Sequence, residues 1–246
     1  MEGKSYFQIK GMPLIKFQDK DKIKSLQSGK IYAKTLEYYR KREEETGDCE
    51  VGDKYEEMVH INDATIYFPD MGEIVPIKDE LLKTSESNDF VFCMFGINPD
   101  LKKFSFTDEQ KEKMLSFGDT ALVVLDSEEF IRRVNIAAKN AGYQAEFNSV
   151  NYYNPNIDGG NMLFSLGAGM WNIAFWKRDS YIYQQEVRFV FRPGAENVDH
   201  IELDIGDISD ITAIISAEKA LSAIVQNEAP IEDEWGLGVK YLEVHK

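Results

Sequence analysis

The sequence is poor in the residues on which many catalytic and structural sites depend. Only two of its 246 residues are cysteine, Cys49 and Cys93, and only three are histidine. Two cysteines are too few for a disulfide framework, and no pair of His or Cys residues has the spacing of a zinc site. No Ser-His-Asp or Cys-His arrangement can be assembled from the spacing either. The sequence therefore excludes a disulfide-rich domain and predicts no metal site.

Long apolar segments are also lacking. No apolar run approaches the length that crosses a membrane, and residues 1–5 contain no apolar stretch of the kind found in signal peptides. We therefore expect a soluble, cytoplasmic protein with no membrane partner. Cys93 lies in an apolar run and is expected to be a buried thiol, which suits a reducing compartment.

Positive charge is scarce. Lys and Arg total 28 against 43 Asp and Glu, which gives a formal net charge of −15. Such a chain is repelled by a nucleic-acid backbone unless a local basic patch overrides the overall field. The lysines near the N-terminus are interpreted as a solvated helix face, with a nucleic-acid groove as the alternative. These lysines are Lys10, Lys16, Lys20, Lys22, Lys24 and Lys30.

The remaining composition is that of a globular domain, with 43% hydrophobic and 12% aromatic residues. Expected strands and helices are interspersed without a strict β-α-β rhythm. The length suits one domain that buries a sizeable core. We predict a single α+β domain over residues 1–246, with mixed, largely antiparallel sheets and a few short helices.

Capping signals set the ends of several expected helices. Asp19 or Asp21 can cap a short helix that ends at Gly29. Thr107 and Gln110 have the spacing of a capping box, which predicts that a helix begins there.

Runs of apolar and β-branched residues predict the strands. One strand is expected to start at residue 30 and to end near residues 38–40. The continuous apolar runs 90–95 and 120–125 are short enough to be buried central strands.

An acidic stretch between residues 43 and 57 carries oxygens enough for a hard cation. Its spacing lacks the order of a calcium-binding loop, so we predict a solvated acidic loop. The acidic side chains that could supply these oxygens are Asp48, Glu50, Asp53, Glu56 and Glu57.

The most informative segment is residues 183–191, Tyr-Gln-Gln-Glu-Val-Arg-Phe-Val-Phe. In an extended conformation its side chains alternate, so Gln184, Glu186 and Arg188 share one face while the apolar side chains face the core. A carboxylate and a carboxamide fixed two residues apart can hydrogen-bond two neighbouring hydroxyls of a sugar.

The pair Gln184-x-Glu186 resembles the (Gln/Glu)-x-Glu element that opens a strand in the ADP-ribosyltransferase superfamily. The resemblance implies an ADP-ribosyltransferase-like fold and NAD as a substrate. It implies that Glu186 stabilises an oxocarbenium-like transition state as nicotinamide leaves, and that Gln184 positions the acceptor. Where that superfamily often carries Ser-x-Ser, this chain has Phe92-Cys93-Met94.

The same resemblance asks for an arginine near the end of an early strand that grips the phosphates of NAD. Arg40 is the candidate for this role, and Tyr39 would stack or hydrogen-bond on the dinucleotide. Alternatively, Arg188 is the phosphate ligand in place of Arg40, or it only holds Glu186 in place.

The implied function is transfer of ADP-ribose from NAD to a macromolecule, in the manner of a bacterial toxin or a phage-defence effector. The acidity of the chain favours a protein acceptor, although a local groove would allow a nucleic acid. An antitoxin or another complex partner is also expected. The alternative is a non-enzymatic binding module of a defence or toxin–antitoxin complex, which would scatter Arg40, Gln184 and Glu186 and expose an apolar patch.

The same residues can also have purely structural roles. Glu186 can form a cross-strand ion pair, and Arg40 can be a surface arginine among charged neighbours. Residues 175–181 combine aromatic and basic side chains, which suits either acceptor recognition or an ordinary surface turn.

Overall fold

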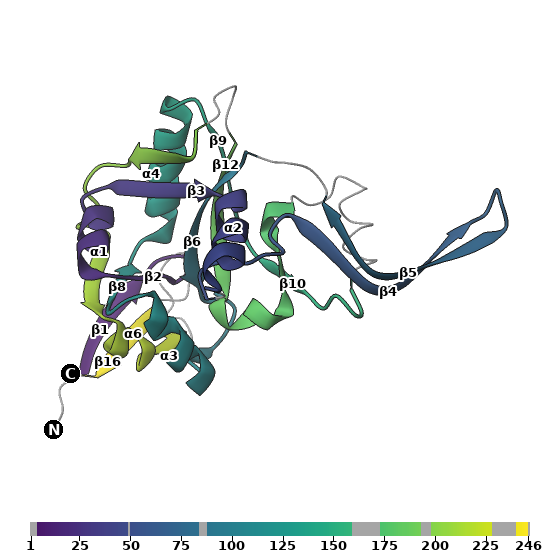
Figure 1. Ribbon diagram of the computed structural model, residues 1–246. Helices are drawn as coiled ribbons and strands as arrows, with labels where there is room; N and C mark the ends of the chain where they lie inside the picture. Colours follow the sequence, from purple (N-terminus) through teal and green to yellow (C-terminus); the bar gives the residue numbers. More distant parts are fainter. Residues whose placement is uncertain are drawn as a thin grey trace, which may run out of the picture.

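The computed structural model describes residues 4–48, 50–83, 88–158, 173–192, 198–227 and 240–245 (Figure 1). Over these residues the chain forms mostly antiparallel sheets with a few short helices, as the sequence predicted. The α-helices are α1 (Lys20–Gln27), α2 (Leu36–Thr46), α3 (Asp108–Met114), α4 (Ser127–Asn140) and α6 (Ala217–Leu221). The 3-10 helices are η1 (Leu115–Phe117), η2 (Ile173–Phe175) and η3 (Asp179–Gln184).

The largest sheet organises the molecule. Its strand order is β13-β3-β6-β2-β8-β14, and β12 pairs with the opposite edge of β6 and is followed by β9. Its strands are β2 (Leu14–Gln18), β3 (Lys30–Thr35), β6 (Phe90–Gly96), β8 (Thr120–Val124), β9 (Gln144–Ser149), β12 (Glu186–Arg192), β13 (His200–Asp204) and β14 (Thr212–Ser216).

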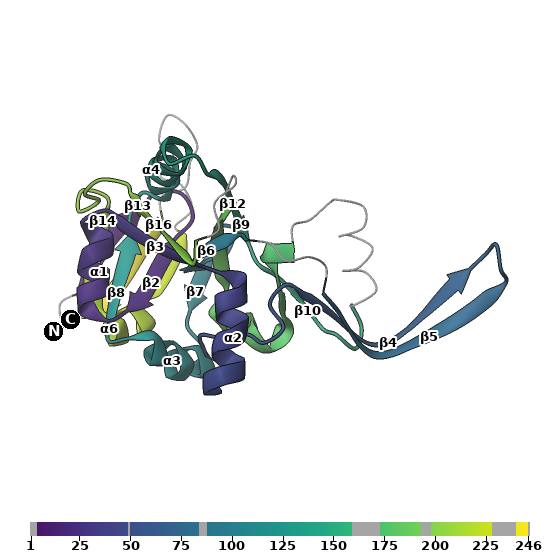
Figure 2. The same cartoon turned by 45° about the horizontal axis from the view of Figure 1, so that its top comes forward.

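The other strands form three smaller groups. A second sheet has the order β1-β16-β15-β7, β10 and β11 pair in parallel, and β4 and β5 form a hairpin. The hairpin projects away from the body of the molecule in both views (Figure 1, Figure 2). These strands are β1 (Lys4–Ile9), β4 (Met58–Phe68), β5 (Glu73–Lys83), β7 (Lys103–Ser105), β10 (Asn151–Tyr153), β11 (Trp176–Arg178), β15 (Ile224–Asn227) and β16 (Lys240–His245).

The central strands are apolar on both faces because both faces of the sheet are covered. On β8, Leu122 and Val124 pack into one cluster with residues of α1 and α4. Ala121 and Val123 pack into a second cluster with residues of α3, α6 and the smaller sheet. Burial on both sides explains why the apolar runs that became β6 and β8 are continuous rather than alternating.

Two strands, β2 and β3, share one edge of β6 and diverge from each other along it, and we call this arrangement the fork. The last residues of β6 pair with β2 at Gly96 and Phe95, whereas its first residues pair with β3 at Val91 and Phe90. The middle of this edge, residues 92–94, pairs with neither strand, because β2 and β3 diverge there. Helix α1 links β2 to β3 across the opening. The fork therefore leaves a short piece of strand edge without a pairing strand in the middle of the largest sheet.

The predicted helix starts are confirmed. Helix α1 follows Asp19 and ends before Gly29, whose φ of 99° lies in the region that favours glycine. Helix α3 carries the full capping box of Thr107 and Gln110. In contrast, the strand expected to run to residues 38–40 ends at Thr35, whose side chain caps α2. Residues 38–40 are therefore helical.

The described residues contain no helix that is both long enough and apolar enough to span a membrane.

Candidate functional site

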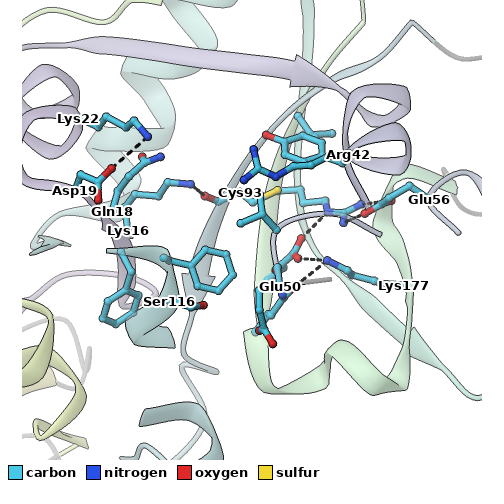
Figure 3. A pocket seen from close by; sticks show the side chains of 18 residues that line it. Lys16, Gln18, Asp19, Lys22, Arg42, Glu50, Glu56, Cys93, Ser116 and Lys177 are labelled. Carbon is cyan, nitrogen blue, oxygen red and sulfur yellow. Dashed lines mark hydrogen bonds and ion pairs between the residues drawn. The ribbon is translucent and has the colours of Figure 1, made fainter. Parts of the chain in front are cut away.

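A cavity of about 310 Å³ lies where β2, β6 and β12 approach α2 (Figure 3). Its wall includes Tyr39, Gln184, Glu186 and Arg188, so the structure brings together four of the five predicted site residues. The fifth, Arg40, does not line it. We call this cavity the carboxylate cavity. It is also lined by Lys16, Phe17, Gln18, Asp19, Lys22, Arg42, Glu50, Val51, Glu56, Val91, Cys93, Ser116, Phe117 and Lys177.

Glu186 is the first residue of β12 and is a buried, ionised carboxylate. One of its oxygens accepts a hydrogen bond from Nζ of Lys177 at 2.6 Å, and the other accepts one from Nε of Arg188 at 2.8 Å. Burial alone would raise the pKa of Glu186, but the two cations lower it well below its usual range. A carboxylate has about four acceptor sites, so Glu186 can still accept hydrogen bonds from a ligand.

Arg188 holds Glu186 in place and is not free to bind a phosphate. The residue is 1% exposed, and its guanidinium forms a two-bond ion pair with Glu56 as well as the bond to Glu186. A further bond of 2.6 Å reaches the carbonyl oxygen of Ala174. Of the two roles predicted for Arg188, the geometry therefore supports the one that orients the carboxylate.

Gln184 precedes the strand rather than belonging to it. It ends the 3-10 helix η3, and Gln185 then adopts a left-handed conformation with φ 38° before β12 begins. The Gln184 side chain accepts from Lys177 at 2.8 Å and donates to the carbonyl oxygen of Glu50 at 2.8 Å. The predicted shared face of Gln184, Glu186 and Arg188 is present, although a turn rather than strand alternation places Gln184 on it.

Lys177 is a site residue that sequence reasoning did not single out. It lies on β11, and its ammonium joins Gln184 to Glu186. Burial alone would lower the pKa of Lys177, but Glu186 and Glu56 raise it, so the ammonium stays charged. The prediction for residues 175–181 concerned an exposed loop that recognises the acceptor. The structure instead buries Lys177 inside the charge network.

Tyr39 and Arg40 have different environments, although they are adjacent in sequence. Tyr39 lines the carboxylate cavity, and burial raises the pKa of its hydroxyl well above the usual range. Arg40 is buried elsewhere. Among the described residues its Nε has no hydrogen-bond partner, and its ion pair is a 3.5 Å contact with Glu37. The prediction that Arg40 reaches the cleft is wrong. Arg42 lines the cavity instead, since residues three apart share a helix face.

The acidic stretch is not the solvated loop that its sequence predicted. Asp53, Glu56 and Glu57 are each no more than 3% exposed. Burial raises the pKa of Glu56 to about 6 despite its ion pair with Arg188. Part of the stretch thus forms a wall of the site. The described residues hold no group of three or more His, Cys, Asp or Glu side chains placed to bind a metal ion.

Cys93 lines the cavity without being a plausible nucleophile. Burial raises the pKa of its thiol to about 12, so the reactive thiolate is not populated at neutral pH. Its backbone carbonyl, at the fork of β6, accepts a hydrogen bond of 2.6 Å from Nζ of Lys16.

A second cavity, of about 460 Å³, continues from the first into the fork between β2 and β3. We call it the fork cavity. The two cavities share Lys16, Gln18, Lys22, Tyr39, Arg42, Val51, Val91 and Cys93 in their walls. Together they form one cleft with two chemically different ends.

Comparison of the chain with protein-family models, with curated proteins and with solved structures finds no match. The geometry of the cleft and the resemblance of its short motif are therefore the two indications of function.

Proposed function

We propose that this protein is an NAD-dependent ADP-ribosyltransferase with an ADP-ribosyltransferase-like fold, and that Glu186 is its central catalytic residue. The observation that supports this most strongly is the placement of an ionised, buried carboxylate in a cavity, beside Gln184 and Tyr39. A negative charge held rigidly by two cations stabilises a developing positive charge without having to reorganise. That is the property an oxocarbenium-like transition state requires.

In the proposed reaction the bond between ribose C1′ and the nicotinamide nitrogen breaks, and its electron pair leaves with nicotinamide. Glu186 stabilises the cationic ribose through the ribose 2′-hydroxyl, using acceptor sites not occupied by Lys177 and Arg188. A nucleophile on the acceptor then adds to C1′ and releases its proton to water. Gln184 orients that acceptor through its amide oxygen, and Tyr39 lies against the dinucleotide.

The acceptor is proposed to be a macromolecule, and water would replace it in simple NAD hydrolysis. The net charge of −15 favours a protein acceptor at long range. The motif resemblance further suggests a cytoplasmic toxin or phage-defence effector that has a neutralising partner.

The test is nicotinamide release from NAD by purified protein, with and without cell extract. We expect Glu186→Gln to reduce release by on the order of a hundredfold or more, because it removes the charge at the reacting centre. Glu202→Gln, an exposed carboxylate on β13, is the matched control and should leave the rate unchanged. Release that is absent in every extract, without stabilisation of the protein by NAD, would contradict the proposal.

A second variant separates transfer from hydrolysis. Gln184→Ala should lower transfer of labelled ADP-ribose to the acceptor more than it lowers nicotinamide release, because Gln184 is assigned to the acceptor. Its thermal unfolding should be recorded alongside, since Gln184 also bonds Lys177 and the Glu50 carbonyl.

The second candidate function is a non-enzymatic binding module, and the β4–β5 hairpin supports it. Near the end of this arm four large apolar side chains are 42% to 66% exposed. Exposed apolar patches of this kind often mark protein interfaces. Binding of a partner through the arm would be lost in the double variant Met71→Ser, Ile74→Ser, and under this function the unaltered protein would release no nicotinamide. The four side chains are Tyr67, Met71, Ile74 and Val75.

A further inference from the structure

The fork cavity is positively charged in a strongly acidic protein. Five cationic side chains contribute to its wall, and none of the described residues that line it is an Asp or a Glu. Three of the five belong to the lysine-rich segment near the N-terminus. The fold therefore gathers part of that segment at one cavity, while Lys20 and Lys24 of the same segment do not line it. The five cations are Lys16, Lys22, Lys30, Lys34 and Arg42.

Lys16 lies at the junction of the two cavities and is the least compensated of these cations. Its Nζ donates one hydrogen bond, to the Cys93 carbonyl, and lies 5.0 Å from the ring centre of Phe92. Among the described residues it forms no ion pair with a carboxylate; burial lowers its pKa, and Glu186, at longer range, only partly offsets this. An ammonium has three N–H donors, so two remain for a ligand in the cleft. An anion placed there would relieve the cost of burying this charge.

The other four cations are held by carboxylates. Lys22 contacts Asp19 at 3.4 Å, Lys34 contacts Asp199 at 3.0 Å and Arg42 contacts Asp48 at 2.7 Å, while Lys30 pairs with Asp204. Ion pairs of this partly exposed kind contribute little free energy, so their cations can turn towards a ligand at small cost. Asp48, Asp199 and Asp204 do not line the fork cavity.

Aromatic faces complete the cavity. Tyr32 on β3 and Tyr38 on α2 both line it and are 50% and 37% exposed. Nζ of Lys34 lies 5.7 Å from the ring centre of Tyr32 and 5.0 Å from that of Tyr38. The Tyr32 ring also packs against His200, with 4.9 Å between the ring centres. Partly exposed aromatic rings beside ammonium groups are surfaces on which nucleic bases stack while their phosphates are neutralised.

We propose that the fork cavity binds a nucleoside phosphate, with Lys16 holding a phosphate oxygen and Tyr32 or Tyr38 stacking on the base. The inference goes beyond the proposed function, because it requires no chemistry at Glu186. Two sources share this chemistry. One is the adenosine diphosphate half of a dinucleotide whose other end reaches Glu186, and the other is one nucleotide of a single-stranded nucleic acid.

The test measures binding of two probes, ADP-ribose by calorimetry and a fluorescent single-stranded oligonucleotide of mixed sequence by anisotropy. We expect Lys16→Met to weaken the affinity for whichever probe the wild-type protein binds by about tenfold or more, because a hydrogen bond to a charged group is lost. The methionine keeps the aliphatic stem packed. Lys22→Gln should weaken binding severalfold, and Lys24→Gln, an exposed change on the same helix outside the cavity, should leave it unchanged.

The two probes distinguish the sources. Binding of ADP-ribose alone would assign the cavity to a dinucleotide. Oligonucleotide binding that weakens with salt would assign it to nucleic acid. Failure of both probes to bind, or unchanged affinity in a folded Lys16→Met protein and in Lys22→Gln, would overturn the inference.

The variant Glu186→Gln distinguishes ligand binding in the fork cavity from the proposed enzymatic activity. This variant should still bind the oligonucleotide, and should still bind ADP-ribose through its adenosine diphosphate half, while nicotinamide release collapses. A cavity that binds a probe in a protein that never releases nicotinamide would support the inference and contradict the proposed enzyme.

Discussion

The charged side chains at the two ends of the cleft are neutralised in different ways. In the carboxylate cavity, Glu186 and Glu56 are buried with Lys177 and Arg188, and each charge is met by an opposite one. In the fork cavity, the cations pair with carboxylates at the rim or, for Lys16, with a backbone carbonyl. A buried network is costly to rearrange, whereas rim pairs exchange partners readily. The first arrangement suits a fixed catalytic charge, and the second suits ligand binding and release.

The largest effect is expected from breaking the buried network. Arg188→Met leaves two buried carboxylates with Lys177 as their remaining cation, so the free energy of unfolding should fall by about 3–5 kcal/mol. Arg192→Met is the matched control on the same strand and face. Its side chain is 43% exposed and pairs with Glu146 at 2.8 Å and, more loosely, with Asp89 at 3.7 Å, so its loss should be smaller, about 1 kcal/mol. Urea denaturation measures both, and equal losses would refute the contrast between the two arginines.

A smaller effect is expected on the pH dependence of stability. The folded protein holds the pKa of Glu186 below its value in the unfolded chain. The unfolded state therefore binds the proton first, and the stabilisation is present above about pH 4.5 and is lost as the pH falls below that value. Glu186→Gln removes this contribution, so its free energy of unfolding should decline less steeply between pH 4.5 and 3 than that of the wild type.

Glu202→Gln serves as the control for that pH series. It should follow the wild-type curve, because this exposed carboxylate lies on β13 and lines neither cavity. Parallel curves for wild type and Glu186→Gln would show that the ion pairs of Glu186 contribute no pH-dependent stability.

The smallest effect is expected from the ion pairs at the rim of the fork cavity. Here the substitution should strengthen ligand binding rather than weaken a property of the protein. Asp204→Asn removes the partner of Lys30 and should leave the unfolding midpoint unchanged. The freed ammonium should raise the affinity of the fork cavity for the probe about two- to threefold at low salt, and less at high salt. Binding titrations at two salt concentrations measure this. A loss of affinity would mean that Asp204 orients Lys30 for the ligand rather than competing with it.

The parts that were predicted correctly from sequence depend on near neighbours in the chain. The capping box of Thr107 and Gln110 spans three residues, and the start of α1 at Asp19 is equally local. The apolar runs of β6 and β8 predicted buried strands, because a strand covered on both faces needs apolar side chains at every position. The shared face of Glu186 and Arg188 followed from strand alternation.

The prediction that Arg40 reaches the cleft failed because the local conformation of the chain differs from the expected one. The sequence predicts the end of a strand at residues 38–40, but Thr35 caps a helix that contains these residues. In a helix, Tyr39 and Arg42 share a face, whereas Arg40 is turned by about 100° from Tyr39. The conformation of this short segment thus decides which arginine reaches the cleft.

The sequence by itself determined the mixed, mostly antiparallel character of the fold, the starts of α1 and α3 and the polar face at Glu186, because each depends on local propensity and periodicity. Only the tertiary structure decided which charges meet. Glu56 pairs with Arg188 across 132 positions, and Lys16 reaches Cys93 across 77. An acidic stretch or a run of lysines looks solvated in sequence, since nothing local indicates the distant partner that makes its burial tolerable. The divergence of β2 and β3 from β6, which creates the cleft, is likewise a property of the assembled sheet.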